Sequence, residues 1–190
     1  LQELDYQGPQ LIGQALSACR LAESAPVDIL DAGCGSGLCA HLLRPLANTL
    51  VGVDLSTKML DRARELELYD DLIEGDLVEV LRSQPSAFDL IVVTDTFGYF
   101  GDLEPAFSAA QHALSPKGFL ICTIELDQVH SDTAEGFRLM QSGRYCHTLN
   151  YVEASLATAN LKANSITTGT LRREADGRVS CVVVTAQRAG

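Results

Sequence analysis

The stretch VDILDAGCGSGL, residues 27–38, decides the fold, because an apolar run leads directly into a loop that carries three glycines. A short apolar run that ends in turn residues is typical of a strand buried on both faces of a parallel sheet. In open parallel sheets, ligands bind outside the carboxyl ends of the strands, where the strand order reverses. The stretch therefore predicts a central strand followed by a ligand-binding loop.

Strands and helices alternate along the rest of the chain. We predict further strands over residues 49–56, 71–76, 88–95 and 118–125, and helices over 9–22, 38–46, 57–68, 104–114 and 150–159. This alternation predicts right-handed crossovers and a doubly wound α/β fold, with helices on both faces of a parallel sheet. Two more apolar runs flank an Asp-Gly pair at residues 176–177, a strong hairpin signal. The last strand is therefore expected to run antiparallel.

The composition and net charge favour a single-domain protein and disfavour nucleic-acid-binding and membrane-spanning proteins. The chain has 190 residues, 46% of them hydrophobic, and a formal net charge of −11 at pH 7. This length suits one domain with a full core, and the shortage of Lys and Arg disfavours a nucleic-acid partner. The chain has neither a run of roughly 18 apolar residues nor a basic leader, so we expect no membrane span and a cytoplasmic location. Its six cysteines form no C-x-x-C pair, so we expect no disulfide framework and no metal site.

The glycine loop departs from the fingerprint of dinucleotide-binding proteins. That fingerprint is G-x-G-x-x-G, in which the third glycine lets the helix pack closely while its N-terminus faces the pyrophosphate. Here Gly33, Gly35 and Gly37 alternate, and Leu38 occupies the place of the third glycine. Asp31 precedes the loop, where a carboxylate suits a positive charge better than a phosphate. A nicotinamide-dependent oxidoreductase is therefore the less favoured alternative.

Two further carboxylates end the strands that follow. Asp54 lies about twenty residues after Asp31, the distance at which an acidic side chain accepts hydrogen bonds from ribose hydroxyls. Capping of the next helix is the alternative role for Asp54. Asp76 ends the third strand, where it could accept a hydrogen bond from an adenine amino group; a plain turn residue is the alternative. Leu55, Met59 and Leu77 would then be apolar neighbours of the adenine ring.

Together these motifs resemble class I S-adenosylmethionine-dependent methyltransferases. ILDAGCGSG is similar to the first motif of that family, VGVDLS to the second, EGDL to the third and FDLIVVTDTFGYF to the fourth, while ALSPKGFLICTIE resembles the run through its fifth strand. The resemblance covers residues 25–126. More narrowly, HLLRPLANTLVGVDLSTKMLDRAREL, YDDLIEGDLVEVL and SGRYCHT resemble predicted methyltransferase domains that follow tetratricopeptide repeats in some bacterial proteins. The first residue is not Met, so we expect the sequence to be part of a longer chain with N-terminal repeats.

The resemblance implies a Rossmann-like sheet of seven strands that binds S-adenosyl-L-methionine and releases S-adenosyl-L-homocysteine. We expect a single domain over residues 1–190, with a covering helix in 1–24, the cofactor-binding core in 25–126, and a substrate-side loop, a helix and a terminal hairpin in 127–190. Carried over by position, the expected cofactor-binding residues are Asp31, Gly33, Gly35, Gly37, Leu38, Asp54, Leu55, Met59, Asp76, Leu77, Thr94 and Thr96.

The same resemblance implies methyl transfer to an oxygen or nitrogen of a small molecule or protein. Alignment of the reacting atoms supplies much of such a rate, and a general base helps where the acceptor loses a proton. The candidate bases are Asp95, His130 and His147, with Tyr99 and Tyr145 as orienting groups. A binding module that keeps the cofactor pocket without catalysis is the other alternative, because a fold does not fix a function.

The segment SGRYCHT, residues 142–148, is the expected substrate contact, because relatives build substrate lids at this point of the chain. The forked donors of Arg144 suit an anionic acceptor. Tyr145 and His130 complete the candidate substrate contacts, and an ordinary polar loop is the alternative.

Overall fold

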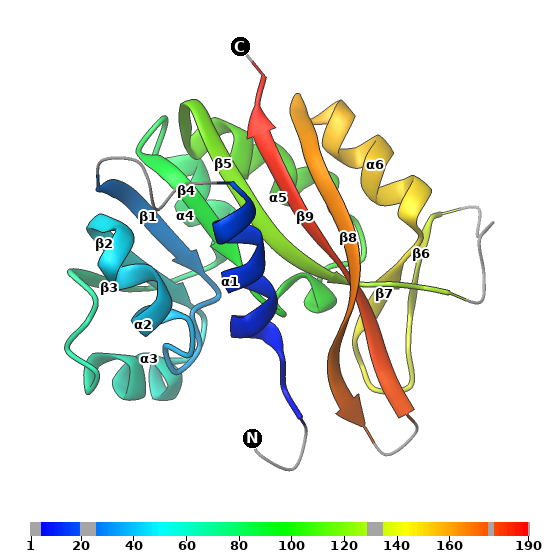
Figure 1. The fold of residues 1–190 in the computed structure, drawn as a ribbon, viewed down its shortest axis with the longest axis horizontal. Helices are drawn as coiled ribbons and strands as arrows, with labels where there is room; N and C mark the ends of the chain where they lie inside the picture. The colour runs from blue at the N-terminus through cyan, green and yellow to red at the C-terminus, as the bar shows by residue number, and fades with distance from the viewer. Residues whose placement is uncertain (1–4, 20–25, 129–134, 175–176, 190) are drawn as a thin grey trace.

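A computed structural model describes residues 5–19, 26–128, 135–174 and 177–189 (Figure 1). Its centre is a seven-stranded sheet with the order β3-β2-β1-β4-β5-β9-β8. The strands are β1 (Val27–Ala32), β2 (Ala47–Asp54), β3 (Asp71–Glu74), β4 (Phe88–Val93), β5 (Leu114–Glu125), β8 (Leu161–Glu174) and β9 (Gly177–Arg188). Strands β1 to β5 pair in parallel, whereas β9 is antiparallel to both β5 and β8. The predicted Rossmann-like sheet with an antiparallel last strand is confirmed.

Helices cover both faces of this sheet. They are α1 (Gly8–Ala18), α2 (Ala40–Leu43), α3 (Thr57–Arg64), α4 (Leu77–Ser83), α5 (Glu104–Ala113) and α6 (Leu149–Thr158), with the short 3₁₀ turns η3 (Arg44–Leu46) and η4 (Phe97–Tyr99). Buried side chains of α1 and α2 pack on one face, and those of α4, α5 and α6 pack on the other. In Figure 1, α1 crosses the near face while α5 lies behind the sheet. Within the described ranges, no helix is long and apolar enough to cross a membrane.

Several elements differ from the sequence prediction. The first helix ends at Ala18, and residues 20–22 of the predicted helix lie outside the described residues. The helix predicted over residues 38–46 has α-helical geometry only in α2, and Pro45 lies in the 3₁₀ turn that follows. Proline lacks an N–H donor, which explains why regular helix does not continue through this point. Helix α3 ends at Arg64 instead of residue 68.

One helix and one pair of short strands were not predicted. Helix α4 has only seven residues, of which Leu77 and Leu81 are buried, so its apolar pattern is too short to reveal a helix. A small antiparallel pair, β6 (Phe137–Leu139) with β7 (Tyr145–His147), lies in the segment that the sequence presents as polar and irregular. The turn of the predicted terminal hairpin, residues 175–176, lies outside the described residues, but β8 and β9 pair on both sides of it as expected.

The strand order reverses between β1 and β4. From β1 the chain first adds β2 and β3 on one side, then returns to add β4 and β5 on the other. At such a point the loops that follow the two neighbouring strands diverge and leave a crevice. The residues after Ala32 and after Val93 therefore face the same space at the carboxyl edge of the sheet.

Candidate active site

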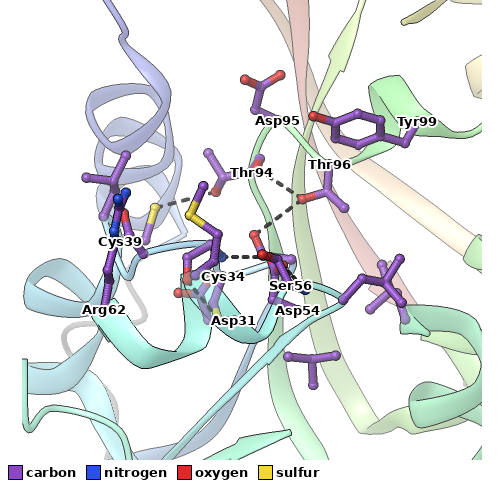
Figure 2. A pocket seen from close by; sticks show the side chains of 18 of the residues that line it. Asp31, Cys34, Cys39, Asp54, Ser56, Arg62, Thr94, Asp95, Thr96 and Tyr99 are labelled. Carbon is purple, nitrogen blue, oxygen red and sulfur yellow. Dashed lines mark hydrogen bonds between the residues drawn. The ribbon is translucent and has the colours of Figure 1, made fainter. Parts of the chain in front are cut away.

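A cavity of about 750 Å³ opens at this reversal point (Figure 2). In Figure 2, Asp31, Cys34 and Asp54 lie toward one end of the cavity, and Asp95 and Tyr99 toward the other. Of the residues predicted to bind a cofactor, the structure brings eleven together around this cavity: Asp31, Gly33, Gly35, Leu38, Asp54, Leu55, Met59, Asp76, Leu77, Thr94 and Thr96.

The glycine loop explains why Gly37 is the exception. All three glycines of the loop have positive φ, which favours glycine over other residues. A Cβ on Gly33 would lie 2.1 Å from Oγ1 of Thr96, so this glycine lets the loops after β1 and β4 approach closely. A Cβ on Gly37 would instead lie 2.6 Å from Cδ1 of Leu66. Gly37 therefore packs against the segment after α3, and its predicted contact with the cofactor stays a prediction.

Asp54 links the loops that follow β1 and β2. Its Oδ2 accepts a hydrogen bond from the Gly35 N–H at 2.9 Å, and its Oδ1 accepts one from the Ser56 N–H at 2.8 Å. Ser56 is the N-cap of α3, so Asp54 bonds to the residue before the helix rather than to its first turn. A carboxylate oxygen can accept more than one hydrogen bond. Asp54 thus supports the glycine loop and retains acceptor capacity toward the cavity.

Asp31 is a buried carboxyl group at the base of the cavity. Its Oδ2 accepts a hydrogen bond from the Tyr69 hydroxyl at 2.7 Å. Burial raises the pKa of Asp31 to about 6; the nearby Asp54 also raises it, while the Tyr69 hydrogen bond lowers it. Because the charged form is poorly solvated here, a cationic ligand group would stabilise it strongly. Tyr69 lies in an irregular stretch before β3, and no sequence motif marked it.

Asp76 caps a helix, a role that was not predicted for it from the sequence. It is the N-cap of α4, and its Oδ1 accepts hydrogen bonds from the N–H groups of Val78 at 2.9 Å and Glu79 at 3.0 Å. The residue still borders the cavity, beside Leu77.

The opposite end of the cavity is organised around Asp95, which follows β4. Its φ of +57° is unusual for a residue other than glycine. Its N–H donates to Oγ1 of Thr123 at 2.8 Å, and its carbonyl oxygen accepts from Nη2 of Arg144 at 2.7 Å. These two contacts hold the backbone in its strained conformation.

Four charged side chains close into a ring at this end, which we call the charge ring: Asp95, Arg144, Glu125 and Arg172. Arg172 donates to Oδ1 of Asp95 at 2.9 Å and to Oε1 of Glu125 at 2.8 Å. Arg144 donates to the same two oxygens. Burial raises the pKa of Asp95, and the two guanidinium groups oppose that shift. Sequence analysis identified Asp95 and Arg144 but missed Glu125 and Arg172, which lie 47 residues apart in the chain.

The remaining predicted catalytic and substrate residues lie elsewhere. His147 is fully buried, its Nε2 is 2.9 Å from the carbonyl oxygen of Gly101, and burial lowers its pKa. Tyr145 packs edge-on against Phe137. Neither side chain borders the cavity: the buried His147 is enclosed away from it, and the role of Tyr145 toward the acceptor stays a prediction. His130 lies outside the described residues.

Arg144 also departs from the role expected of it. Its guanidinium group bonds to Asp95 and Glu125 and lies 4.6 Å from the centre of the Tyr99 ring. These partners satisfy most of the donors that an anionic acceptor was expected to use. No group of three or more His, Cys, Asp or Glu in the described part of the chain is arranged to hold a metal ion.

Gly98 gives Arg144 the space to reach the charge ring. A Cβ at Gly98 would lie 2.7 Å from Nη2 and 2.9 Å from Nε of Arg144. We expect Gly98→Ala to displace the guanidinium group and to lower the free energy of unfolding by about 1–3 kcal/mol, measured by urea denaturation. Gly13→Ala is the control, because its Cβ would meet Leu42 at an ordinary 3.6 Å and alanine favours the helix. Equal stability of Gly98→Ala and the unmodified protein would contradict this packing role.

Parts of the chain are similar in sequence to known proteins. Residues 30–122 match the family described as "Methyltransferase domain". The chain is 35% identical over 83 residues to the 18S rRNA (guanine-N(7))-methyltransferase of Bos taurus, covering 44% of this chain and 30% of that protein. It is 33% identical over 107 residues to the malonyl-acyl carrier protein O-methyltransferase of Erwinia billingiae, covering 56% of this chain and 42% of that protein. The chain thus spans less than half the length of these two relatives.

A solved structure resembles the fold over almost the whole chain. The Burkholderia thailandensis 1,6-didemethyltoxoflavin-N1-methyltransferase, solved with 1,6-didemethyltoxoflavin and S-adenosylhomocysteine bound, superposes with a TM-score of 0.74. The alignment covers 97% of this chain and 80% of that chain at 14% sequence identity. Similarity at this level of identity concerns the fold alone.

Proposed function

We propose that the chain is a class I methyltransferase that transfers the methyl group of S-adenosylmethionine to an oxygen or nitrogen atom of an acceptor, because residues 30–122 match the family described as "Methyltransferase domain". The observation that supports this most directly is the cavity at the strand-order reversal, where Asp31, the glycine loop and Asp54 converge. A ligand that carries one cationic group and one ribose would contact these acidic residues and glycines when bound in the cavity.

The cavity lining fits the cofactor chemically. Asp31 would hold the ammonium group, Asp54 the ribose hydroxyls, and Leu55, Met59 and Leu77 the adenine ring. A Cβ on Gly35 would meet no atom within 4 Å, so the loop backbone stays open at that point. When bound, the cofactor supplies a methyl group on a sulfonium sulfur, and this carbon–sulfur bond breaks as the acceptor atom attacks.

Asp95 is the residue best placed to accept the proton that the acceptor atom loses. Among the described residues, the hydrogen bonds to its carboxylate all reach Oδ1, which leaves Oδ2 as an acceptor. Burial raises the pKa of Asp95, which makes its carboxylate a stronger base. Tyr99 borders the same end of the cavity and would orient the acceptor.

We propose a small-molecule or protein acceptor rather than a nucleic acid. The net charge of −11 leaves no excess of Lys and Arg to neutralise phosphates. For this reason we do not assign to this chain the RNA substrate that appears in the name of the bovine relative. The finer resemblance, to methyltransferase domains that follow tetratricopeptide repeats, stays a prediction.

Calorimetric titration with S-adenosylhomocysteine tests the cofactor assignment. We expect saturable binding, no comparable binding of NAD, and affinity at least tenfold weaker in Asp54→Ala, since hydrogen bonds to a charged group contribute about 1.5–3 kcal/mol each. Asp61→Ala is the control, because that carboxylate is exposed on α3 and pairs with Arg64. Absent binding, or tighter binding of NAD, would contradict the proposed function. Binding without turnover of any acceptor would favour the non-catalytic alternative.

A further inference from the structure

The charge ring determines the net charge at the end of the cavity where the acceptor would bind. It contains two carboxylates and two guanidinium groups, and each arginine bonds to both acids. The exposed fractions of the Glu125 and Arg172 side chains are only 7% and 8%. The four charges of the ring balance, but Arg172 also pairs with Glu174 at 2.8 Å, so the cluster that includes Glu174 carries one excess negative charge. An added carboxylate would therefore bring a further negative charge into a site whose acids already outnumber its guanidinium groups.

One acceptor atom of the ring remains available to a ligand. The bonds from Arg144 and Arg172 reach Oδ1 of Asp95, so within the described ranges Oδ2 has no protein donor. Its direction is fixed, because Thr123 holds the Asp95 N–H and Arg144 holds the carbonyl oxygen at a φ of +57°. A carboxylate oxygen without a protein donor suits an O–H or N–H group of a ligand.

The walls around this oxygen are aromatic. Tyr6, Tyr99 and Phe100 border the same cavity. Tyr99 is 68% exposed even though the Arg144 guanidinium group lies over its ring. Aromatic side chains of this kind contact flat rings by offset or edge-on packing.

We propose that the charge ring makes this site selective for neutral aromatic acceptors that present an O–H or N–H group to Asp95, and that it excludes carboxylates. The inference rests on the proposed function and adds the acceptor class. Arg144 and Arg172 are positioning residues in this scheme, since they hold Asp95 instead of contacting the acceptor. The acceptor atom gives its proton to Oδ2 of Asp95 as it forms a bond to the methyl carbon and the carbon–sulfur bond of the cofactor breaks.

Two probes of the same shape test the selectivity: 2-naphthol, which is neutral at pH 7, and 2-naphthoate, which is anionic. Each is titrated calorimetrically into protein saturated with S-adenosylhomocysteine. We expect 2-naphthol to bind at least tenfold more tightly. In Asp95→Asn the excess negative charge is removed, so the preference for 2-naphthol over 2-naphthoate should narrow several-fold. Asparagine tolerates positive φ, so the backbone at this position is not further strained.

Asp5→Asn is the matched control. This carboxylate is exposed and pairs with Arg173 at 3.3 Å, next to Arg172 in sequence, so the substitution changes the charge equally without entering the ring. It should retain the preference for 2-naphthol.

The outcomes separate the inference from the function on which it rests. If S-adenosylhomocysteine does not bind the unmodified protein, the proposed function fails, and the acceptor class fails with it. If it binds but 2-naphthoate binds as tightly as 2-naphthol, or neither probe binds, only the inference is overturned. Binding of S-adenosylhomocysteine by Asp95→Asn establishes that this variant is folded. If the folded variant keeps the same preference for 2-naphthol over 2-naphthoate, the inference is also overturned. If the variant does not fold, the comparison on the unmodified protein decides alone.

Discussion

Asp31→Asn is expected to weaken binding of S-adenosylhomocysteine at least tenfold and, at the same time, to stabilise the free protein. Above pH 6 the native state must hold a charged carboxylate in buried surroundings, which raise its pKa from 3.8 to about 6. A shift of this size corresponds to roughly 2–3 kcal/mol, and asparagine avoids that cost while still accepting the Tyr69 hydrogen bond. The variant loses the charge that would hold the ammonium group of the ligand.

The effect of pH has opposite signs for stability and for binding. Since the folded pKa of Asp31 lies above its ordinary value, the stability that this group contributes is fully present below about pH 4 and is lost as pH rises through 6. Ligand affinity should instead fall as pH drops through 6, because the protonated carboxyl group no longer attracts a cation.

Urea denaturation and calorimetry at pH 5 and pH 8 measure both effects. Asp28→Asn is the control, since Asp28 lies at the other end of β1 and bonds to Asn48. It should leave ligand affinity unchanged. An Asp31→Asn variant that binds normally, or that is less stable than the unmodified protein at pH 8, would refute this account of the buried carboxyl group.

Arg172→Met should destabilise the fold by about 3–5 kcal/mol, because it leaves Asp95 and Glu125 sharing one guanidinium group in a buried site. Arg173→Met, one residue along β8, removes an arginine whose side chain is 58% exposed and should change the free energy of unfolding by about 0.5 kcal/mol or less.

A second variant separates charge from packing. Arg172→Met combined with Glu125→Gln restores a neutral site, so it should recover more than half of the loss in a double-mutant cycle followed by urea denaturation. If Arg172→Met and Arg173→Met prove equally mild, the charge ring does not stabilise the fold.

The fold was largely predictable because its signals are local. The apolar run before Gly33, the strand ending at Asp54, the turn at Asp76 two residues after β3, and the Asp-Gly pair each lie within a few residues of the structure that they specify. Helix α4 was missed because a seven-residue element shows barely two turns of apolar periodicity. Strands β6 and β7 have three residues each and offer no alternation to detect.

The two ends of the cavity differed in predictability for the same reason. Cofactor-side residues directly follow strand ends, so sequence position alone indicates where they lie. The charge ring joins residues up to 77 positions apart, and nothing near Arg172 in sequence marks its partners. His147 was misplaced because it lies on the face of β7 that packs against Phe137 and away from the cavity.

The charge ring also constrains how this protein can diverge. Its members come from the ends of β4 and β5, from the residue before β7 and from β8, and three of them lie outside residues 30–122. Loss of any one member leaves a buried charge without its counterpart, so single substitutions pass through an unstable intermediate. New acceptor preferences should therefore arise through paired changes in distant segments. A chimera that exchanges the terminal hairpin with a relative would have to bring the matching acids with it.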